Sequence, residues 1–331
     1  MDHLSGNGVL EEFRIEVSHC WQKMPNKVFF FVLLASWIAL FHFLGNSTFG
    51  YAPTPSLLVW MYDAFTRNGQ DLLNSDEAYG LLIPFVVLAL FWWKRRELLS
   101  LELRVWPPGL ALVATGLGFH VLGYLVQQPR LSIIGMFTGV YGLIGLAWGP
   151  ASLKASTFPF FLFVFCIPLG SLVEPITFRL RLLVSQLVVL ISHFILAIDV
   201  ERDGTILMDA TRHYQYEVAA ACSGIRSLLA TFALAVILAF VSLRKPWKRL
   251  VMIASAVPLA VMGNLLRMLA IIIAAELGGQ EWGNRVHEGG PFGIFSLLPY
   301  VPAFLGLLVL EYYLREPTPL LPPPTLAHQH A

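Results

Sequence analysis

The sequence predicts an all-α polytopic membrane protein with about eight transmembrane helices, an amphipathic helix on the outer face and a small β-hairpin. Hydrophobic residues make up 56% of the 331 residues and charged residues only 13%, whereas soluble domains carry about 25% charged residues. The apolar residues are grouped into long stretches, and about 20 residues in a helix cross the hydrocarbon core of a bilayer. Lysines and arginines gather in alternate connections between these stretches, as a single orientation in the membrane requires.

Eight apolar stretches are candidate spans. They comprise residues 28–44, 79–93, 107–126, 131–149, 156–173, 217–243, 250–275 and 291–313. Residues 51–65 are apolar but interrupted by prolines, which favours a position at the membrane interface. Residues 175–199 mix Arg179, Arg181 and His193 with leucines and valines. This mixture indicates an amphipathic helix on the outer surface, with a ninth span as the alternative.

The basic residues set the expected orientation. They occur in four regions of the sequence. Before the first apolar stretch are Lys23 and Lys27; between the second and third are Lys94, Arg95, Arg96 and Arg104; between the fourth and fifth is Lys154; and between the sixth and seventh are Arg244, Lys245, Lys248 and Arg249. The positive-inside rule places these connections and both termini in the cytoplasm. We therefore expect a cytoplasmic N-terminus over 1–27, one multi-pass membrane domain over 28–313, and a Pro-rich disordered tail over 314–331.

The opposite connections, at 45–78, 127–130, 174–216 and 276–290, then face the exterior. The largest is 174–216, and it ends in a segment whose apolar and polar residues alternate around Asp203-Gly204. Alternation on both sides of an Asp-Gly pair is typical of a β-hairpin. We expect a small hairpin here that leads into the sixth apolar stretch.

Three reactive polar residues have matched expected depths in the membrane. Cys222 precedes Arg244 by 22 residues, which is about 33 Å of helix. Arg267 follows Arg249 by 18 residues, or about 27 Å of helix, and His287 lies in the connection before the last apolar stretch. All three are therefore predicted at the outer edge of the bilayer.

A thiol, a guanidinium and an imidazole together can carry out acyl transfer. Cys222 lies in the first turns of the sixth apolar stretch, where a helix dipole favours the nucleophilic thiolate, and its neighbours Ser223 and Gly224 are small enough for a substrate to approach. His287 is a candidate general acid and base. Arg267, costly within an apolar helix, is a candidate to stabilise the thiolate or an oxyanion.

Several neighbours are candidate supporting residues. Asn264 lies three residues before Arg267 on the same predicted helix face, so its amide is a candidate to hold the guanidinium. Arg226 lies four residues after Cys222, where it either assists the thiol or pairs elsewhere.

Glu288 and Glu217 are alternative partners that would orient His287, and the sequence does not select between them. The other two cysteines, Cys20 and Cys166, are read as a bystander and a packed core residue. Cysteine and histidine spacings do not match a metal site, so no cofactor is expected. The net charge of +1 does not favour nucleic acid as a partner.

Three segments carry a resemblance to a known family. They are "EVAAACSGIRSLLA" (217–230), "GNLLRMLAI" (263–271) and "VHEGGPFGIF" (286–295). In order and spacing they resemble the cysteine, arginine and histidine blocks of the exosortase/archaeosortase family of multi-pass transpeptidases, and the wider resemblance covers about 80–312. The histidine at 287 favours the bacterial exosortase branch.

The resemblance implies a thiol protease and transpeptidase in the cytoplasmic membrane, with its active site facing the periplasm or exterior. Its substrates would be exported proteins of the PEP-CTERM type, which end in a short motif, a transmembrane helix and a basic segment. Cys222 would form a thioester with the substrate, and an amine, an alcohol or water would then accept the acyl group. Arg267 and His287 match the other two family positions.

Two other classes of protein remain as alternatives. One is a transporter or a polytopic scaffold of polysaccharide export, for which Cys222 would be dispensable; the paired, interrupted helices expected of a transporter are not evident in the sequence. The other is a different intramembrane hydrolase or an acyltransferase. A rhomboid-like serine protease would need a Gly-x-Ser-Gly motif, which the sequence lacks.

Overall fold

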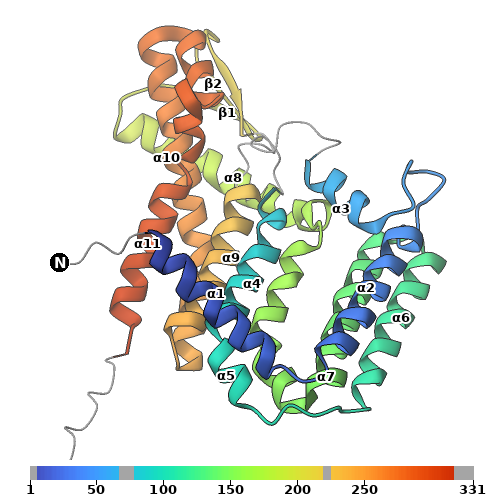
Figure 1. The fold of residues 1–331 in the computed structure, drawn as a ribbon. Coiled ribbons are helices and arrows are strands. Elements are labelled where there is room, and N and C mark those ends of the chain that lie inside the picture. Colours follow the sequence, from blue (N-terminus) through green and yellow to red (C-terminus); the bar gives the residue numbers. More distant parts are fainter. Residues whose placement is uncertain (1–5, 67–77, 219–224, 317–331) are drawn as a thin grey trace, which may run out of the picture. The chain divides into compact units, whose positions relative to one another are not determined.

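The computed structural model describes residues 6–66, 78–218 and 225–316 (Figure 1). These residues are mostly helical, with one small sheet, which confirms the predicted class of a helical membrane protein. The chain divides into two compact units, unit 1 over Met1–Leu172 and unit 2 over Val173–Ala331. The boundary lies near the start of helix α8.

Unit 1 is built from apolar helices. Its elements are α1 (Gly6–Lys23), α2 (Lys27–Leu44), α3 (Leu57–Thr66), η1 (Ala78–Leu81), α4 (Ile83–Trp93), α5 (Arg95–Ser100), α6 (Gly109–Leu125), α7 (Pro129–Phe161) and η2 (Leu162–Cys166). Helices α6 and α7 are in close contact because glycines face each other: a Cβ on Gly116 would lie 2.5 Å from the Gly135 carbonyl oxygen. Small residues at such positions let the backbones of membrane helices approach.

Helix α7 is a helical hairpin. Gly149 has φ 90° and ψ 174°, which interrupts the helix. The rings of Phe137 and Phe163 stack with centroids 4.2 Å apart, and the Tyr141 hydroxyl donates to the Leu153 carbonyl at 2.8 Å. Both contacts join residues on opposite sides of Gly149, so the chain reverses direction there.

Unit 2 combines helices with a three-stranded sheet. Its elements are α8 (Gly170–Phe194), β1 (Val200–Asp203), β2 (Ile206–Asp209), β3 (Gln215–Glu217), α9 (Ile225–Ser242), α10 (Pro246–His287), η3 (Pro291–Leu297) and α11 (Tyr300–Leu314). The strands are antiparallel in the order β1-β2-β3, and Asp203 pairs with Ile206 across a two-residue turn. Gly204 has φ +61° in this turn, so the predicted hairpin is confirmed. The third strand was not predicted.

The sheet packs into the core of unit 2. Its buried residues form one cluster with residues of α8 and α10: Val184 and Val188 from α8; Val200, Leu207, Tyr214, Tyr216 and Val218 from the sheet segment; and Met268, Leu269, Ile271, Ile272 and Ala275 from α10. A second cluster joins α9, α10 and α11 through Ala235, Ala239, Leu243, Met252, Ala256 and Leu307. Helix α10 takes part in both clusters and so connects the sheet to the other helices.

The predicted count of eight spans is not confirmed. Within the described residues, five helical segments are long and apolar enough to cross a membrane: Lys27–Leu44, Pro129–Cys166, Leu172–Phe194, Pro246–His287 and Ile294–Leu314. Three shorter apolar helices cover Tyr79–Trp93, Gly109–Leu125 and Ser227–Ser242. The first group includes α8, for which the sequence favoured a surface position. One of its arginines, Arg181, is buried and paired with Glu174 on the same helix.

Some predicted boundaries were wrong. The sixth apolar stretch was predicted to begin at 217, but Glu217 belongs to β3 and the described part of α9 begins at Ile225. The predicted outer loop 276–290 is largely helical, because α10 continues to His287. The apolar residues 51–65 contribute most of helix α3, and their position at the membrane interface stays a prediction.

Replacing Gly149 with alanine tests the α7 hairpin. We expect Gly149→Ala to lower the free energy of unfolding by about 1–3 kcal/mol, because alanine disfavours positive φ and its Cβ would lie 3.1 Å from the Arg104 carbonyl oxygen. Gly118→Ala in α6 is the matched control, since nothing lies within 4 Å of its Cβ position. Thermal unfolding of both variants in detergent checks this. Equal stability of the two variants would contradict the account.

Candidate functional site

The candidate site lies where α10 breaks and turns back. Gly278 and Gly279 leave the helical region, with φ −137° and φ +71°, so α10 consists of a long arm over 246–277 and a return arm over 280–287. A Cβ on Gly283 in the return arm would lie 2.9 Å from the Ala275 side chain of the long arm. The return arm therefore packs back along the helix from which it came.

The reversal brings Arg267 and His287 together. Nη2 of Arg267 donates a hydrogen bond to the main-chain carbonyl of His287 at 3.1 Å, although the two residues are 20 positions apart. The Arg267 side chain is half-buried, and its Nε is buried with no hydrogen-bond partner among the described residues. A half-buried guanidinium with a buried, unused donor retains hydrogen-bonding capacity for a negatively charged group.

Asn264 lies one turn before Arg267 and is buried. Within the described chain, the hydrogen bond of the guanidinium goes to the His287 carbonyl and not to the Asn264 amide. The neighbouring Gly263 lies against the start of α11, since a Cβ there would be 2.1 Å from the Pro299 carbonyl oxygen. The backbone around Asn264 is thus held between two elements.

A tyrosine that the sequence analysis did not select holds the return arm on the sheet. Tyr216 of β3 is buried, and its hydroxyl donates to the Gln280 carbonyl at 3.0 Å. Gly283 leaves the space for this ring, because a Cβ there would lie 2.0 Å from the Tyr216 oxygen. The rings of Tyr216 and His287 have centroids 6.1 Å apart. Burial raises the pKa of Tyr216, so its hydroxyl remains a donor at neutral pH.

Further hydrogen bonds fasten the same strand to α10. The Gln215 N–H donates to Oε1 of Gln280 at 3.0 Å, and Nε2 of Gln280 donates to the Gln215 carbonyl at 3.4 Å. Tyr214 donates to the Glu276 carboxylate at 3.4 Å. Burial and then the Glu276 charge raise the pKa of Tyr214. Gln280 thereby pairs with the edge of β3 much as another strand would.

The structure describes only some of the remaining predicted site residues. Glu288 follows the return arm and Glu217 ends β3, and both are exposed. Cys222, Ser223 and Gly224 lie outside the described residues, as does the side chain of Arg226. Within the described ranges, no three His, Cys, Asp or Glu side chains are grouped as metal ligands.

Apolar helices of membrane-spanning length define the chain as a multi-pass membrane protein. The family model described as transmembrane exosortase matches residues 70–308, and the chain belongs to this family. The match includes Arg267, His287 and the complete β-sheet. No curated protein and no solved structure showed significant similarity to the chain.

The hydroxyl of Tyr216 provides a stability test of this geometry. We expect Tyr216→Phe to lower the free energy of unfolding by about 1–2 kcal/mol, because it removes one buried hydrogen bond to Gln280. The same change at Tyr312, whose side chain is 76% exposed, should have almost no effect. Denaturant unfolding in detergent micelles compares the two variants. A Tyr216→Phe variant as stable as Tyr312→Phe would show that the hydrogen bond contributes nothing.

Proposed function

We propose that the chain is a membrane cysteine transpeptidase that cleaves a C-terminal sorting signal of exported proteins through a thioester on Cys222. Family membership supports a membrane transpeptidase-like role with protein substrates. The observation that carries the finer proposal is the contact between Arg267 and His287. An arginine within an apolar helix is costly, and here it bonds to the main-chain carbonyl of a candidate general base 20 residues further along α10.

The anchoring of β3 supports a place for Cys222 in the same region. Val218 is fully buried, and its N–H donates to the Thr205 carbonyl at 2.8 Å. Cys222 follows Val218 by four residues, and an extended chain covers at most about 3.6 Å per residue. For Cys222 to act with His287, the four residues that follow Val218 must bridge the gap, and they span at most about 14 Å. Tyr216, two residues before Val218, already lies beside the His287 ring.

The proposed reaction has two acyl-transfer steps. His287 takes the proton of the Cys222 thiol, and the thiolate sulfur attacks the scissile carbonyl carbon. The carbonyl electrons move to oxygen, and Arg267 stabilises the resulting oxyanion. As the oxyanion collapses, the C–N bond breaks and His287 gives its proton to the leaving amine. An acceptor amine, alcohol or water then attacks the thioester carbon and loses a proton to His287. The C–S bond breaks, and the leaving thiolate of Cys222 takes that proton from His287, which restores the thiol.

The supporting roles follow from position in the chain. Ser223 and Gly224, both small, allow the substrate backbone to approach Cys222. Glu288 or Glu217 orients the His287 imidazole, and Arg226 is a further cation near the thiol. Asn264 supports the helix segment that carries Arg267.

The basic connections assign both termini to the cytoplasm and the site to the outer face of the cytoplasmic membrane. The substrate's own transmembrane helix would hold its motif at that depth, and its basic end would remain in the cytoplasm. The bacterial exosortase branch is the assignment that the histidine at 287 favours. Exported proteins with such a C-terminal signal are therefore the proposed substrates.

Replacing Cys222 tests whether the thiol is the nucleophile. We expect Cys222→Ala and Cys222→Ser to leave the substrate precursor uncut in the membrane, because neither side chain supplies a thiolate. Immunoblots of precursor and mature substrate in cells that express each variant measure this, with Ser242→Ala at the other end of α9 as the control. Normal maturation by Cys222→Ala would refute the proposal and favour a transporter or scaffold.

Replacing Arg267 by lysine tests its role separately from charge alone. We expect Arg267→Lys to slow precursor maturation at least about tenfold, because an ammonium does not reproduce the planar donors of a guanidinium. Arg285→Lys is the matched control: its side chain is 67% exposed and pairs with Glu281 on the surface. Pulse-chase labelling of the precursor compares the two rates. Equal rates would remove Arg267 from the site.

Trapping the acyl-enzyme identifies the substrate directly. Hydroxylamine cleaves thioesters. We therefore expect a peptide attached to Cys222 that added hydroxylamine removes and that mass spectrometry identifies. The attached peptide should end at the residue before the scissile bond. A peptide bound to another residue would contradict the assignment of the nucleophile.

A further inference from the structure

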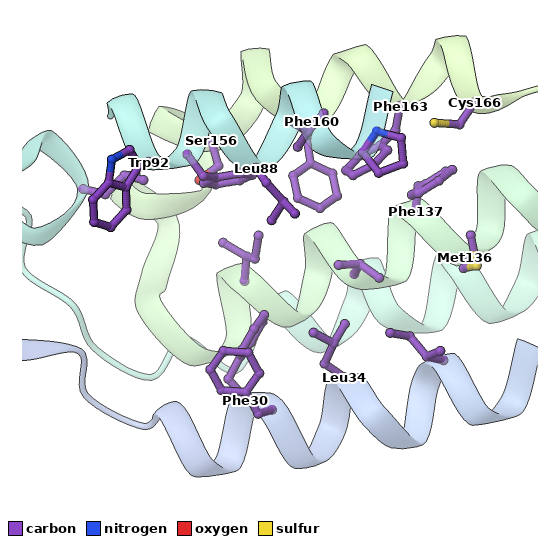
Figure 2. Close-up of a pocket in the computed structure, with 18 of the residues that line it drawn as sticks. Phe30, Leu34, Leu88, Trp92, Met136, Phe137, Ser156, Phe160, Phe163 and Cys166 are labelled. Carbon is purple, nitrogen blue, oxygen red and sulfur yellow. The ribbon is translucent and has the colours of Figure 1, made fainter. Parts of the chain in front are cut away.

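Unit 1 contains a large apolar cavity whose lining includes none of the candidate site residues. Its volume is about 900 Å³, and residues of α1, α2, α4, α5 and both arms of α7 contribute to its walls. Figure 2 shows the part of the lining that comes from α2, α4 and α7. Aliphatic and aromatic side chains dominate the lining, among them Phe30, Leu34, Leu88, Phe137, Phe160 and Phe163. This volume is at the upper end of the range of about 300–1,000 Å³ typical of small-molecule sites.

The cavity has polar groups toward one end. Figure 2 shows Trp92 and Cys166 toward opposite ends, with Ser156 on the side of Trp92. Ser156 is 1% exposed, and its hydroxyl has no hydrogen-bond partner among the described residues. Arg95, which also lines the cavity, stacks its guanidinium on the Trp92 ring. An apolar chamber with unused donors toward one end fits an amphiphile whose polar part lies near Trp92.

The charges at this end favour a phosphate. Arg95 and Arg96 both donate to a single carboxylate oxygen of Glu16, at 2.6 and 3.2 Å. Two guanidinium groups and one carboxylate leave one positive charge. In addition, the Nε of Arg95 is buried without a partner in the described chain. A phosphodiester supplies both a negative charge and acceptor oxygens for such donors.

The charges beside the cavity discriminate between two membrane-embedded occupants. An apolar transmembrane helix offers no anion to Arg95, whereas a phospholipid carries a phosphate next to its acyl chains. An acyl chain is slender enough to enter. Lipid tails gain little from apolar walls when they leave the bilayer, so the headgroup contacts must supply the selectivity.

We infer that unit 1 binds one membrane phospholipid, with an acyl chain in the cavity and its phosphate at Arg95. The acyl chain lies between Leu34 and the aromatic residues Phe137 and Phe163. The phosphate balances the one positive charge of Arg95 and Arg96 that Glu16 does not neutralise. This inference goes beyond the proposed function and does not depend on Cys222. The basic residues around Arg95 indicate that the lipid comes from the cytoplasmic leaflet.

Photocrosslinking of the purified, delipidated full-length protein tests the inference. The probe is phosphatidylglycerol with a diazirine in one acyl chain, and peptide mass spectrometry maps the labelled residues. We expect saturable labelling of the cavity-lining positions on α2 and α7, and unlabelled phosphatidylglycerol should compete with it. Diacylglycerol with the same diazirine chain should label these positions at least about tenfold less, because it lacks the phosphate. Labelling by phosphatidylglycerol that does not saturate, or that is confined to positions outside the cavity, overturns the proposal.

A cavity-filling variant provides a second test. We expect Leu34→Trp to reduce saturable labelling at least about tenfold, because the larger side chain occupies the volume of the acyl chain. Leu117→Trp on α6 is the matched control, since Leu117 is 44% exposed and does not line the cavity. Equal labelling of a folded Leu34→Trp variant overturns the proposal. If that variant does not fold, the competition result with the unaltered protein decides the question.

Discussion

The contact between Arg267 and His287 depends on the backbone reversal at Gly278 and Gly279. As one uninterrupted helix, the 42 residues of α10 would extend for about 63 Å, roughly twice the thickness of the hydrocarbon core. His287 would then stand about 30 Å from Arg267 along the axis. The reversal replaces that separation with a hydrogen bond of 3.1 Å. Two residues without side chains thereby bring two reactive residues together.

The same arrangement occurs in both units, with a tyrosine hydroxyl as one of the groups that tie the returning chain. In unit 1, α7 reverses at Gly149 and Tyr141 bonds to the Leu153 carbonyl. In unit 2, α10 reverses at Gly278–Gly279, and Tyr216 ties the return arm to the sheet. The small sheet therefore fixes the position of the return arm. In turn, the side-chain amide of Gln280 bonds to the outer edge of strand β3.

The parts of the fold predicted from the sequence are those set by local chemistry. Composition indicated the helical membrane class, and Asp203-Gly204 indicated the hairpin, because the residues of a tight turn are adjacent in the chain. The reversal near Gly149 was predicted, because residues 131–149 and 156–173 were read as separate spans on either side of Lys154. The segment 276–290 was read as a loop, and its helical return arm was missed because apolar content does not register backbone angles. For α8, the sequence did not show that Arg181 is buried against Glu174.

The candidate site divides in the same way. Counting residues from the basic connections predicted the depth of Arg267, because helix rise is nearly constant. The position of His287 in the connection before the last apolar stretch predicted the same depth for it. The role of Tyr216 was not predictable, because it depends on a third strand and on the empty space beside Gly283. Cys222 lies outside the described residues, so its approach to the other two residues remains a prediction.

The turn in α10 also limits how the length of this region could vary among homologous sequences. Each residue inserted into a helix rotates everything beyond it by about 100° and shifts it by about 1.5 Å. One insertion between Arg267 and Gly278 would swing the return arm away from the guanidinium and the sheet, whereas the same insertion in the Pro-rich segment after 316 would leave them in place. The contact between Arg267 and His287 thus constrains the number of residues from 267 to 278.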